Sequence, residues 1–418
     1  MRAFLQEALA RFPVAPAVAA AGLRAVAQLE SLPPAAVRAE GHANVIAAFL
    51  AEGIAESDFA GTLGYGYDDA ARDRYEALLA RIFGAERVLA RLSFVSGTHA
   101  IVAALAACAP PGTRIVSATG RPYDTLRNAL VAAPYALAAR GVRYDEIPFA
   151  AEGSVDLAAL AETCRNDPPA VAFVQRSRGY APRRSLSARE CGEIADCVRG
   201  AAPRALVLVD NCYGELVDSS EPTHHGADAV MGSLIKNLGG SLAPAGGYVA
   251  GRAEVVERIA AFHLAPGLGT AVGSSLGFGR AFFQGLWHAP AVVAETLAGL
   301  DFAAALFEEL GYRVDPLPGA ERHDIVQAIA LGNRERLVAF ARGLQRAMPV
   351  NARFAPEPGP VPGYPDPVVM SAGSFVNGAT IELSCDAPLR PPFEVYLQGG
   401  TMREHGVLGA LFAADALA

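Results

Sequence analysis

Lysine is almost absent from this chain of 418 residues. Among its 35 lysine and arginine residues only Lys236 is a lysine, and the others are arginines. A codon bias toward arginine can replace lysine wherever a positive charge is all that is needed. It cannot do so where an amine must lose its proton and attack a carbonyl carbon, because the guanidinium of arginine stays charged. Lys236 is therefore a candidate nucleophile, with chance retention of one surface lysine as the alternative.

Positive charge of any kind is also scarce. The chain has 35 basic residues against 43 acidic ones and a net charge of −8. Without a basic stripe to pair with phosphates, no nucleic-acid partner is expected. The six cysteines contain no CxxC pair, which disfavours a zinc knuckle or a redox dithiol. No group of His, Asp and Glu has metal-ligand spacing either, so no metal site is predicted.

Signal peptides and long apolar runs are missing as well. Glu7 comes too early for the apolar core of a signal peptide, and no stretch of 18 uncharged apolar residues stands out. Sparse cysteines fit a reducing compartment, so we expect a cytoplasmic protein that does not contact membranes. No GxGxxG motif follows the first predicted strand, which disfavours a dinucleotide-binding dehydrogenase.

What the middle of the chain does contain is an alternation of strand and helix patterns. An amphipathic helix is predicted over 68–84 and an apolar helix over 100–108. Strands are predicted at 88–94, 114–117, 171–175, 205–209 and 246–250, of which the most apolar are typical of buried parallel strands. Strands separated by helices predict βαβ units and a doubly wound α/β sheet.

Three parts follow from this organisation. Residues 1–60 are rich in alanine and predict an N-terminal helical arm, residues 61–285 hold the α/β pattern of a large domain, and residues 286–418 predict a smaller C-terminal α+β domain. In the smaller domain we expect strands at 325–330 and 380–383 and a helix at 333–347, with a proline-rich loop between them.

The surroundings of Lys236 favour a chemical role. Apolar residues precede it and glycines follow it, so we expect a desolvated amine with a lowered pKa. The strand at 205–209 ends in Asp210, and a carboxylate at that end of a parallel strand points into the ligand crevice of an open sheet. Pyridoxal 5'-phosphate needs both groups, a lysine to form the aldimine and an aspartate to pair with its pyridinium nitrogen. For Asp210 alone, a helix cap or a turn residue is the alternative.

A phosphate group would need a helix N-terminus. Ser96, Gly97 and Thr98 follow a strand and open an apolar helix, so their N–H groups and hydroxyls could hold a phosphate, although a simple helix cap is the alternative. Ser233 could add another hydroxyl. Tyr123 is a candidate to stack on the cofactor ring, with turn packing as the alternative.

With these residues in order, the chain resembles the Cys/Met-metabolism branch of fold-type I pyridoxal-phosphate enzymes, and more closely its methionine γ-lyase-like "aluminium resistance" family. The matching motifs are GYGYDD (64–69), VSGTHA (95–100), RPYDTL (121–126), QRSRGY (175–180), VDNCYGE (209–215), GSLIKN (232–237), LAPAGGY (242–248), LSCDAPLRPP (383–392) and YLQGG (396–400). The resemblance implies a mostly parallel sheet of the seven-stranded type with flanking helices, in a PLP-binding domain at 61–285.

The resemblance also implies roles for single residues. Lys236 matches the aldimine lysine that moves the α-proton, and Asp210 matches the partner of the pyridine nitrogen. The phosphate cup is matched by Gly97, Thr98 and Ser233, and the stacking ring by Tyr123.

One further match concerns assembly. Tyr65 sits where related lyases place a tyrosine that reaches the neighbouring subunit's phosphate, with turn packing as the alternative for Tyr65 and Tyr67. That position implies active sites completed across a dimer interface, in a homotetramer built as a dimer of dimers.

The substrate side of the site departs from the related lyases. Ile235 precedes the lysine where those enzymes carry a hydroxyl, and Tyr67 takes roughly the place of their phosphate-binding arginine. Arg176 or Arg178 could compensate in charge. For the substrate carboxylate we favour Arg390, which lies between prolines and can offer a bidentate donor pair, with Arg178 as the second choice.

The resemblance implies a lyase that eliminates a β- or γ-substituent from an amino acid, such as the thiol of a cystathionine- or methionine-like substrate, or another leaving group. An aminotransferase or another pyridoxal-phosphate enzyme on the same fold is the alternative. A protein that binds the cofactor and regulates without catalysis is a third possibility.

Overall fold

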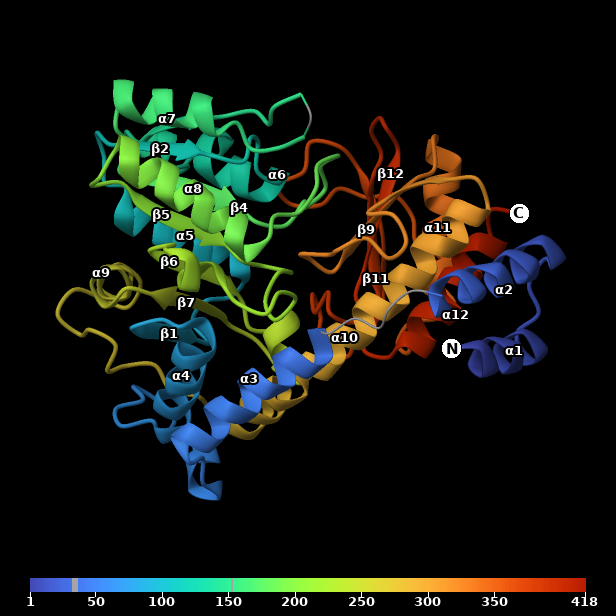
Figure 1. The fold of residues 1–418 in the computed structure, drawn as a ribbon. Helices are drawn as coiled ribbons and strands as arrows, with labels where there is room; N and C mark the ends of the chain where they lie inside the picture. The colour runs from blue at the N-terminus through green and yellow to red at the C-terminus, as the bar shows by residue number, and fades with distance from the viewer. Residues whose placement is uncertain (32–36, 152) are drawn as a thin grey trace.

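The computed structural model describes residues 1–31, 37–151 and 153–418, and it shows two β-sheets connected by one long helix (Figure 1). This helix, α10 (Gly279–Glu309), packs on elements of both halves. The predicted domain boundary after residue 285 therefore falls inside α10, and the two domains share this helix.

The larger sheet has the strand order β1-β7-β6-β5-β4-β2-β3 within the described residues. Its strands are β1 (Arg87–Arg91), β2 (Arg114–Ser117), β3 (Arg143–Glu146), β4 (Val171–Gln175), β5 (Leu206–Asp210), β6 (Ala229–Ser233) and β7 (Gly247–Gly251). Neighbours from β3 to β6 are parallel, whereas β7 runs antiparallel to both β6 and β1. The mostly parallel α/β sheet is confirmed, but the strand predicted at 246–250 is antiparallel.

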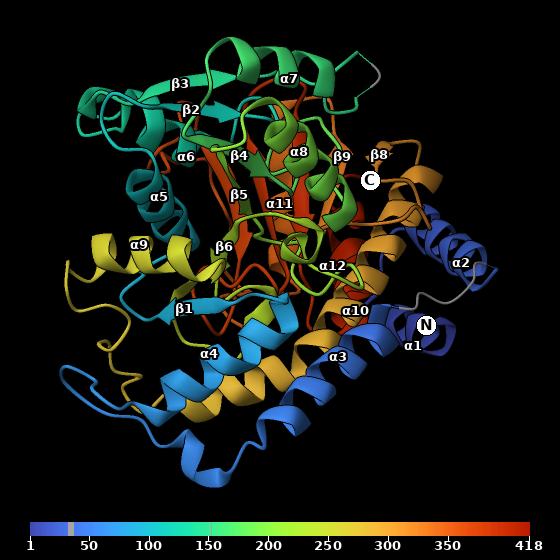
Figure 2. The ribbon, with the colours of Figure 1, turned by 60° about the vertical axis from the view of Figure 1, so that its left-hand side comes forward.

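Helices cover both faces of this sheet (Figure 2). They are α4 (Ala70–Phe83), α5 (Gly97–Cys108), α6 (Asp124–Arg127), α7 (Leu157–Asn166), α8 (Ala188–Ala201) and α9 (Ala253–His263). In β4, Phe173 packs in the apolar cluster that includes α5 and α9, and Val174 packs in the cluster that includes α8. Because alternate side chains of a strand point to opposite faces, burial of both faces explains the uninterrupted apolar runs in the sequence.

The smaller sheet is antiparallel, with the order β10-β11-β12-β9-β8. Its strands are β8 (Arg313–Asp315), β9 (Val326–Ala330), β10 (Val368–Ala372), β11 (Ser384–Pro388) and β12 (Glu394–Gln398), and the helices beside it are α11 (Arg334–Gln345) and α12 (Arg403–Asp415). The strand predicted at 380–383 is wrong, because the strand in this part of the chain, β11, begins only at Ser384. Glu382 accepts hydrogen bonds from the N–H groups of Phe375 and Val376, so this segment closes a turn before β11 begins.

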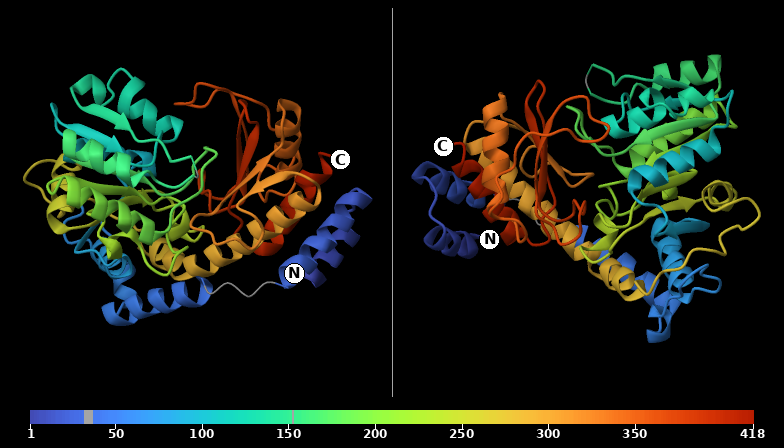
Figure 3. Two further views of the ribbon diagram at one scale, coloured as in Figure 1. Left: turned by 45° about the horizontal axis from the view of Figure 1, so that its top comes forward. Right: turned by 180° about the vertical axis from the view of Figure 1, so that it is seen from behind.

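Most of the described part of the predicted N-terminal arm is helical, and residues 32–36 of it lie outside the described residues. Its helices are α1 (Arg2–Arg11), α2 (Pro16–Glu30) and α3 (Val37–Glu52). Helix α2 packs beside α10 and α12, and α3 lies along α10 and α4 (Figure 3). Of the described helices, α10 alone is long and apolar enough to cross a membrane, yet 67% of its apolar window is buried inside the protein, which is typical of a core helix.

Candidate active site

A cavity of about 410 Å³ opens at the carboxyl ends of the central parallel strands. The last residues of β4, β5 and β6, namely Gln175, Asp210 and Ser233, all line it. Tyr364, Asn377 and Gly378 approach from the loops that flank β10, so both domains contribute to the wall. An open α/β sheet binds its ligands at this end of its strands.

Lys236 lies in this cavity, three residues after the end of β6 and at the start of a short turn of helix. Its Nζ is 3.8 Å from the centre of the Tyr213 ring. Burial acts to lower the pKa of Lys236, but Cys212, Tyr213 and Asp210 raise it above its ordinary range. The expectation of a lowered pKa is therefore wrong for the protein alone, since nearby acidic groups outweigh desolvation. The amine has to give up its proton before it can attack a carbonyl.

Asp210 faces the same cavity from the end of β5. It is 4% exposed, and its Oδ1 accepts a hydrogen bond of 3.1 Å from the N–H of Cys212. Burial raises the pKa of Asp210, while the charge of Lys236 lowers it. A buried carboxylate needs a cationic partner, and a protonated ring nitrogen would supply one.

The N-terminus of α5 forms a third part of the site, where Ser96, Gly97 and Thr98 line the cavity beside Ser233. Ser96 caps the helix, because its Oγ accepts a hydrogen bond from the N–H of His99. A Cβ on Gly97 would lie 3.1 Å from Cys212 Sγ and 3.2 Å from Ser233 Cβ, so any larger residue there would press on two side chains that line the cavity. Such a helix N-terminus suits a phosphate dianion.

Tyr123, which was predicted to stack on the cofactor ring, also lines the cavity and is held there by two hydrogen bonds. Its hydroxyl is 2.8 Å from Thr98 Oγ1, and its backbone N–H donates to the side chain of Gln175. These two bonds fix the ring at the cavity wall. The structure therefore brings together Lys236, Asp210 and the predicted phosphate and stacking residues, a set of groups that fits pyridoxal phosphate.

Tyr65 and Tyr67 lie outside this cavity. Their side chains are 79% and 58% exposed, with ring centroids 6.0 Å apart, on the loop between residues 61 and 69. They do not line the cavity among the residues that the structure describes, so within one chain neither reaches the phosphate cradle.

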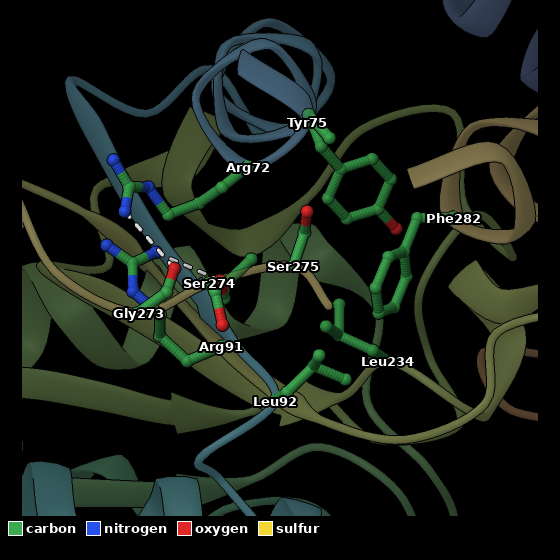
Figure 4. Close-up of a pocket in the computed structure, with 11 residues that line it drawn as sticks. Arg72, Tyr75, Arg91, Leu92, Leu234, Gly273, Ser274, Ser275 and Phe282 are labelled. Carbon is green, nitrogen blue, oxygen red and sulfur yellow. Dashed lines mark hydrogen bonds between the residues drawn. The ribbon is translucent and has the colours of Figure 1, made fainter. Parts of the chain in front are cut away.

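Two arginines that sequence reasoning missed, Arg72 of α4 and Arg91 of β1, reach the segment around Gly273, which lies beside the loop at 61–69 (Figure 4). Arg72 donates from one guanidinium nitrogen to the carbonyls of Gly66 and Gly273, and so joins the loop to the segment before α10. Arg91 donates to the carbonyls of Thr270 and Val272 in the same segment. These hydrogen bonds fix the loop at 61–69, which we call the braced loop and which carries the exposed Tyr65 and Tyr67.

Neither of the arginines predicted for the substrate carboxylate lines the cavity in the described part of the chain. Arg178 instead pairs with Asp315, and its backbone N–H donates to Asp324, so it joins the loop after β4 to the end of β8 and to the segment before β9. Arg390 pairs with Asp124 at 2.8 Å and with Asp366 at 3.4 Å.

Arg176, the other basic residue after β4, is fully buried. It pairs with Asp218 and Glu221 and donates to Asn211, which makes it an internal support of the large domain. Arg176 is not among the described residues that line the cavity, although its neighbours Gln175 and Ser177 are, and its guanidinium is already paired with acidic side chains.

Sequence reasoning also missed four residues around Lys236: Tyr180, Tyr213, Tyr364 and Asp386. The first three line the cavity, and Asp386 accepts a hydrogen bond from the Tyr180 hydroxyl. Three of these residues stand in the motifs QRSRGY, VDNCYGE and LSCDAPLRPP. Those motifs were a signal of importance, but nothing in a linear sequence says that they meet.

Comparisons with known proteins agree with this geometry. A family model described as methionine gamma-lyase matches residues 28–418. The uncharacterized protein YnbB of Bacillus subtilis is 39% identical over 384 residues, which is 89% of this chain and 89% of that protein. A structure from Clostridium acetobutylicum, provisionally described as a cystathionine beta-lyase involved in aluminum resistance, has a TM-score of 0.93 and 37% identity, and covers 100% of this chain and 99% of that one.

A more distant likeness shows the fold alone. The pyridoxal-5'-phosphate dependent protein YhfS of Escherichia coli is 18% identical, with a TM-score of 0.62 and coverage of 92% of this chain and 98% of that one.

Proposed function

Because the chain belongs to the methionine γ-lyase family, we propose that it is a pyridoxal-phosphate-dependent lyase that eliminates a β- or γ-substituent, such as a thiol, from an amino acid. The observation that carries the proposal is the meeting, in one cavity, of the sole lysine of the chain with Asp210 and the cradle at Gly97. The same proposal places the protein in the cytoplasm.

The residues of the cavity divide the work between them. The cofactor, when bound, supplies an electron sink for the substrate's α-carbon. Lys236 would hold the cofactor and would move the α-proton of the substrate, Asp210 would keep the ring nitrogen protonated, and Tyr123 would pack against the ring. The phosphate group would be held by Ser96, Gly97, Thr98 and Ser233.

Arg390 is the residue we assign to the substrate's α-carboxylate. Arg390 lies on the loop before β12, and its guanidinium forms an ion pair with the carboxylate of Asp124. The chain neighbours of Asp124, Tyr123 and Thr125, both line the cavity. A substrate carboxylate would take over the place of Asp124 or Asp366 at the guanidinium, which can hold a carboxylate through two parallel hydrogen bonds.

We further propose that two copies of the chain complete each other's sites. The braced loop offers Tyr65 and Tyr67 to a partner, and exposed apolar side chains lie on the same loop and on the segment beside it: Leu63, Leu268, Leu276 and Phe278. Exposed apolar groups of this kind mark an interface. A homotetramer would pair two such dimers.

A panel of sulfur amino acids tests the proposed activity. A lyase releases ammonia and a 2-oxo acid from at least one of them without any second substrate. An aminotransferase instead needs a second 2-oxo acid as co-substrate. Cofactor binding without turnover of any amino acid would favour a protein that binds the cofactor and regulates without catalysis.

The cradle predicts the effect of Gly97→Ala. The added Cβ would press on Cys212 and Ser233, so we expect the dissociation constant of pyridoxal phosphate to rise by at least about tenfold. The change can be followed by titrating the apoprotein with cofactor and reading its absorbance. Gly200→Ala is the matched control, because nothing lies within 4 Å of its Cβ position. An unchanged dissociation constant for Gly97→Ala would refute the cradle.

Shared sites predict complementation between two inactive variants. Tyr65→Ala and Lys236→Ala chains, denatured and refolded together, should recover about a quarter of the wild-type activity, because half of the dimers are mixed and each mixed dimer has one intact site. Tyr135→Ala, which alters a tyrosine that is 91% exposed elsewhere, should stay active alone. A mixture no more active than its two components would contradict a site shared through Tyr65.

A further inference from the structure

The motif GYGYDD at 64–69 contains a buried aspartate that the proposed function does not use. Asp69 is 0% exposed and stands at the N-terminus of α4, where its Oδ1 accepts a hydrogen bond of 2.9 Å from the N–H of Arg72. Helix capping of this kind needs one oxygen of the carboxylate. The second oxygen is left for other partners, and these come from outside the helix.

The second oxygen joins two segments that lie far apart along the chain. Asp69 Oδ2 accepts hydrogen bonds from the N–H and the hydroxyl of Thr62, at 2.9 and 2.7 Å, and from the N–H of Ser275 at 2.7 Å. The Ser275 hydroxyl lies 2.9 Å from both oxygens and donates to the carboxylate. Burial acts to raise the pKa of Asp69, but the hydrogen bonds from Ser275, Arg72 and Thr62 lower it to about 2, so the carboxylate is ionised at neutral pH.

Tyr65 lies within the loop that Asp69 closes. Its carbonyl accepts a hydrogen bond of 2.8 Å from the N–H of Gly273. A Cβ on Gly66 would lie 2.3 Å from the backbone nitrogen of Ser274, so the loop packs directly on the segment before α10. The backbone of Tyr65 is therefore fixed, although its side chain is 79% exposed.

An exposed tyrosine on a fixed backbone suits contact with a second molecule. Ordering a loop costs conformational entropy, and a loop that is already ordered in the free chain removes this cost from association with a partner. Asp69 bonds both to Thr62 at the start of the braced loop and to Ser275 in the segment beside it. Its carboxylate therefore fixes the loop relative to the body of the large domain.

We propose that Asp69 is a positioning residue for the active site of a second copy of the chain, because it holds the braced loop where Tyr65 can reach the partner's phosphate cradle. This rests on the proposed function, in which two copies complete each other's sites. Asp69 is not among the described residues that line the cavity of its own chain. Its loss should leave that cavity intact and impair the cavity of the partner.

Complementation between variants tests this effect on the partner. Asp69→Asn keeps the shape of the side chain but replaces an acceptor oxygen with a donor, and alone it should retain no more than about a tenth of the wild-type activity at limiting cofactor. Refolded with Lys236→Ala, it should recover about a quarter of the wild-type activity, because a mixed dimer has one site with both a lysine and a held loop. Refolded with Tyr65→Ala, it should recover nothing, because every dimer then lacks an intact loop.

The same mixtures separate a positioning role from a general loss of folding. If Asp69→Asn fails with Lys236→Ala while Tyr65→Ala succeeds with it, Asp69 supports its own chain and the proposal is overturned. Recovery with Tyr65→Ala, or full activity of Asp69→Asn alone, would overturn it as well. If Tyr65→Ala and Lys236→Ala do not recover activity together, the shared site of the proposed function fails, and this proposal falls with it.

Hydrogen exchange gives a second readout that does not depend on activity. In Asp69→Asn the N–H groups of Gly273 and Leu276, which donate to carbonyls of the braced loop, should exchange at least about tenfold faster than in the wild type. Asp156→Asn is the matched control, because Asp156 caps α7 through the N–H of Ala159 in the same way, and it should leave this exchange and the activity unchanged. Unchanged exchange in Asp69→Asn would show that Asp69 does not hold the loop and would refute the proposal.

Discussion

Lys236→Ala is expected to abolish covalent attachment of pyridoxal phosphate and with it all turnover. The amine is the group that joins the cofactor, and loss of its proton transfer alone accounts for a factor of about 10² to 10⁴ in rate. The expected observation is the loss of the absorbance band of lysine-bound cofactor, together with the loss of 2-oxo acid production. Such a chain has no second lysine that could substitute.

Lys236→Arg is the informative companion. It keeps a positive charge beside Asp210 and the Tyr213 ring, so the charge balance of the cavity is preserved. A guanidinium stays protonated and cannot attack the cofactor, so this variant should be as inactive as Lys236→Ala. Activity in Lys236→Arg would mean that position 236 needs only a charge, which would undo the explanation of why the chain keeps one lysine.

The second large effect is expected for Asp210→Asn. The cofactor should still attach to Lys236, but its ring nitrogen would lose the buried carboxylate that keeps it protonated. An unprotonated ring draws fewer electrons from the α-carbon, so we expect kcat to fall by about 10²-fold or more, which is about 2.7 kcal/mol in the activation free energy. Steady-state kinetics on the cofactor-saturated variant measure this loss.

Asp210→Glu serves as the control because it restores the charge on a longer side chain, and it should recover part of the activity lost in Asp210→Asn. A kcat of Asp210→Asn within about twofold of wild type, about 0.4 kcal/mol, would show that Asp210 does not pair with the ring nitrogen.

Much of the large domain could be predicted because its central strands are buried on both faces. Burial makes β4 and β5 continuous apolar runs, and the polar residue that ends each run, Gln175 or Asp210, marks the ligand crevice. Strand β11 in the smaller sheet contains Asp386 and Pro388, residue types that are uncommon in strands, so its sequence carries a weaker strand signal and the strand was expected too early, at 380–383.

The partners of charged side chains could not be predicted in the same way. Arg178 has Asp315 as its partner, 137 positions away along the chain, and Tyr180 meets Asp386 across 206 positions. No local pattern encodes such pairings, since a guanidinium near a strand end suits an ion pair as well as a substrate. The left-handed backbone conformation of Tyr213 could not be predicted from the sequence either, because glycine is the residue that usually adopts it.

The lysine itself gives the most direct test of the account. Borohydride reduction of the cofactor-loaded protein, followed by digestion and mass spectrometry of the peptides, locates the residue that carries the cofactor. The account predicts a single phosphopyridoxyl group, on the peptide that contains Lys236. Cofactor fixed at the N-terminal amine instead, or a protein that carries none after reduction, would contradict it.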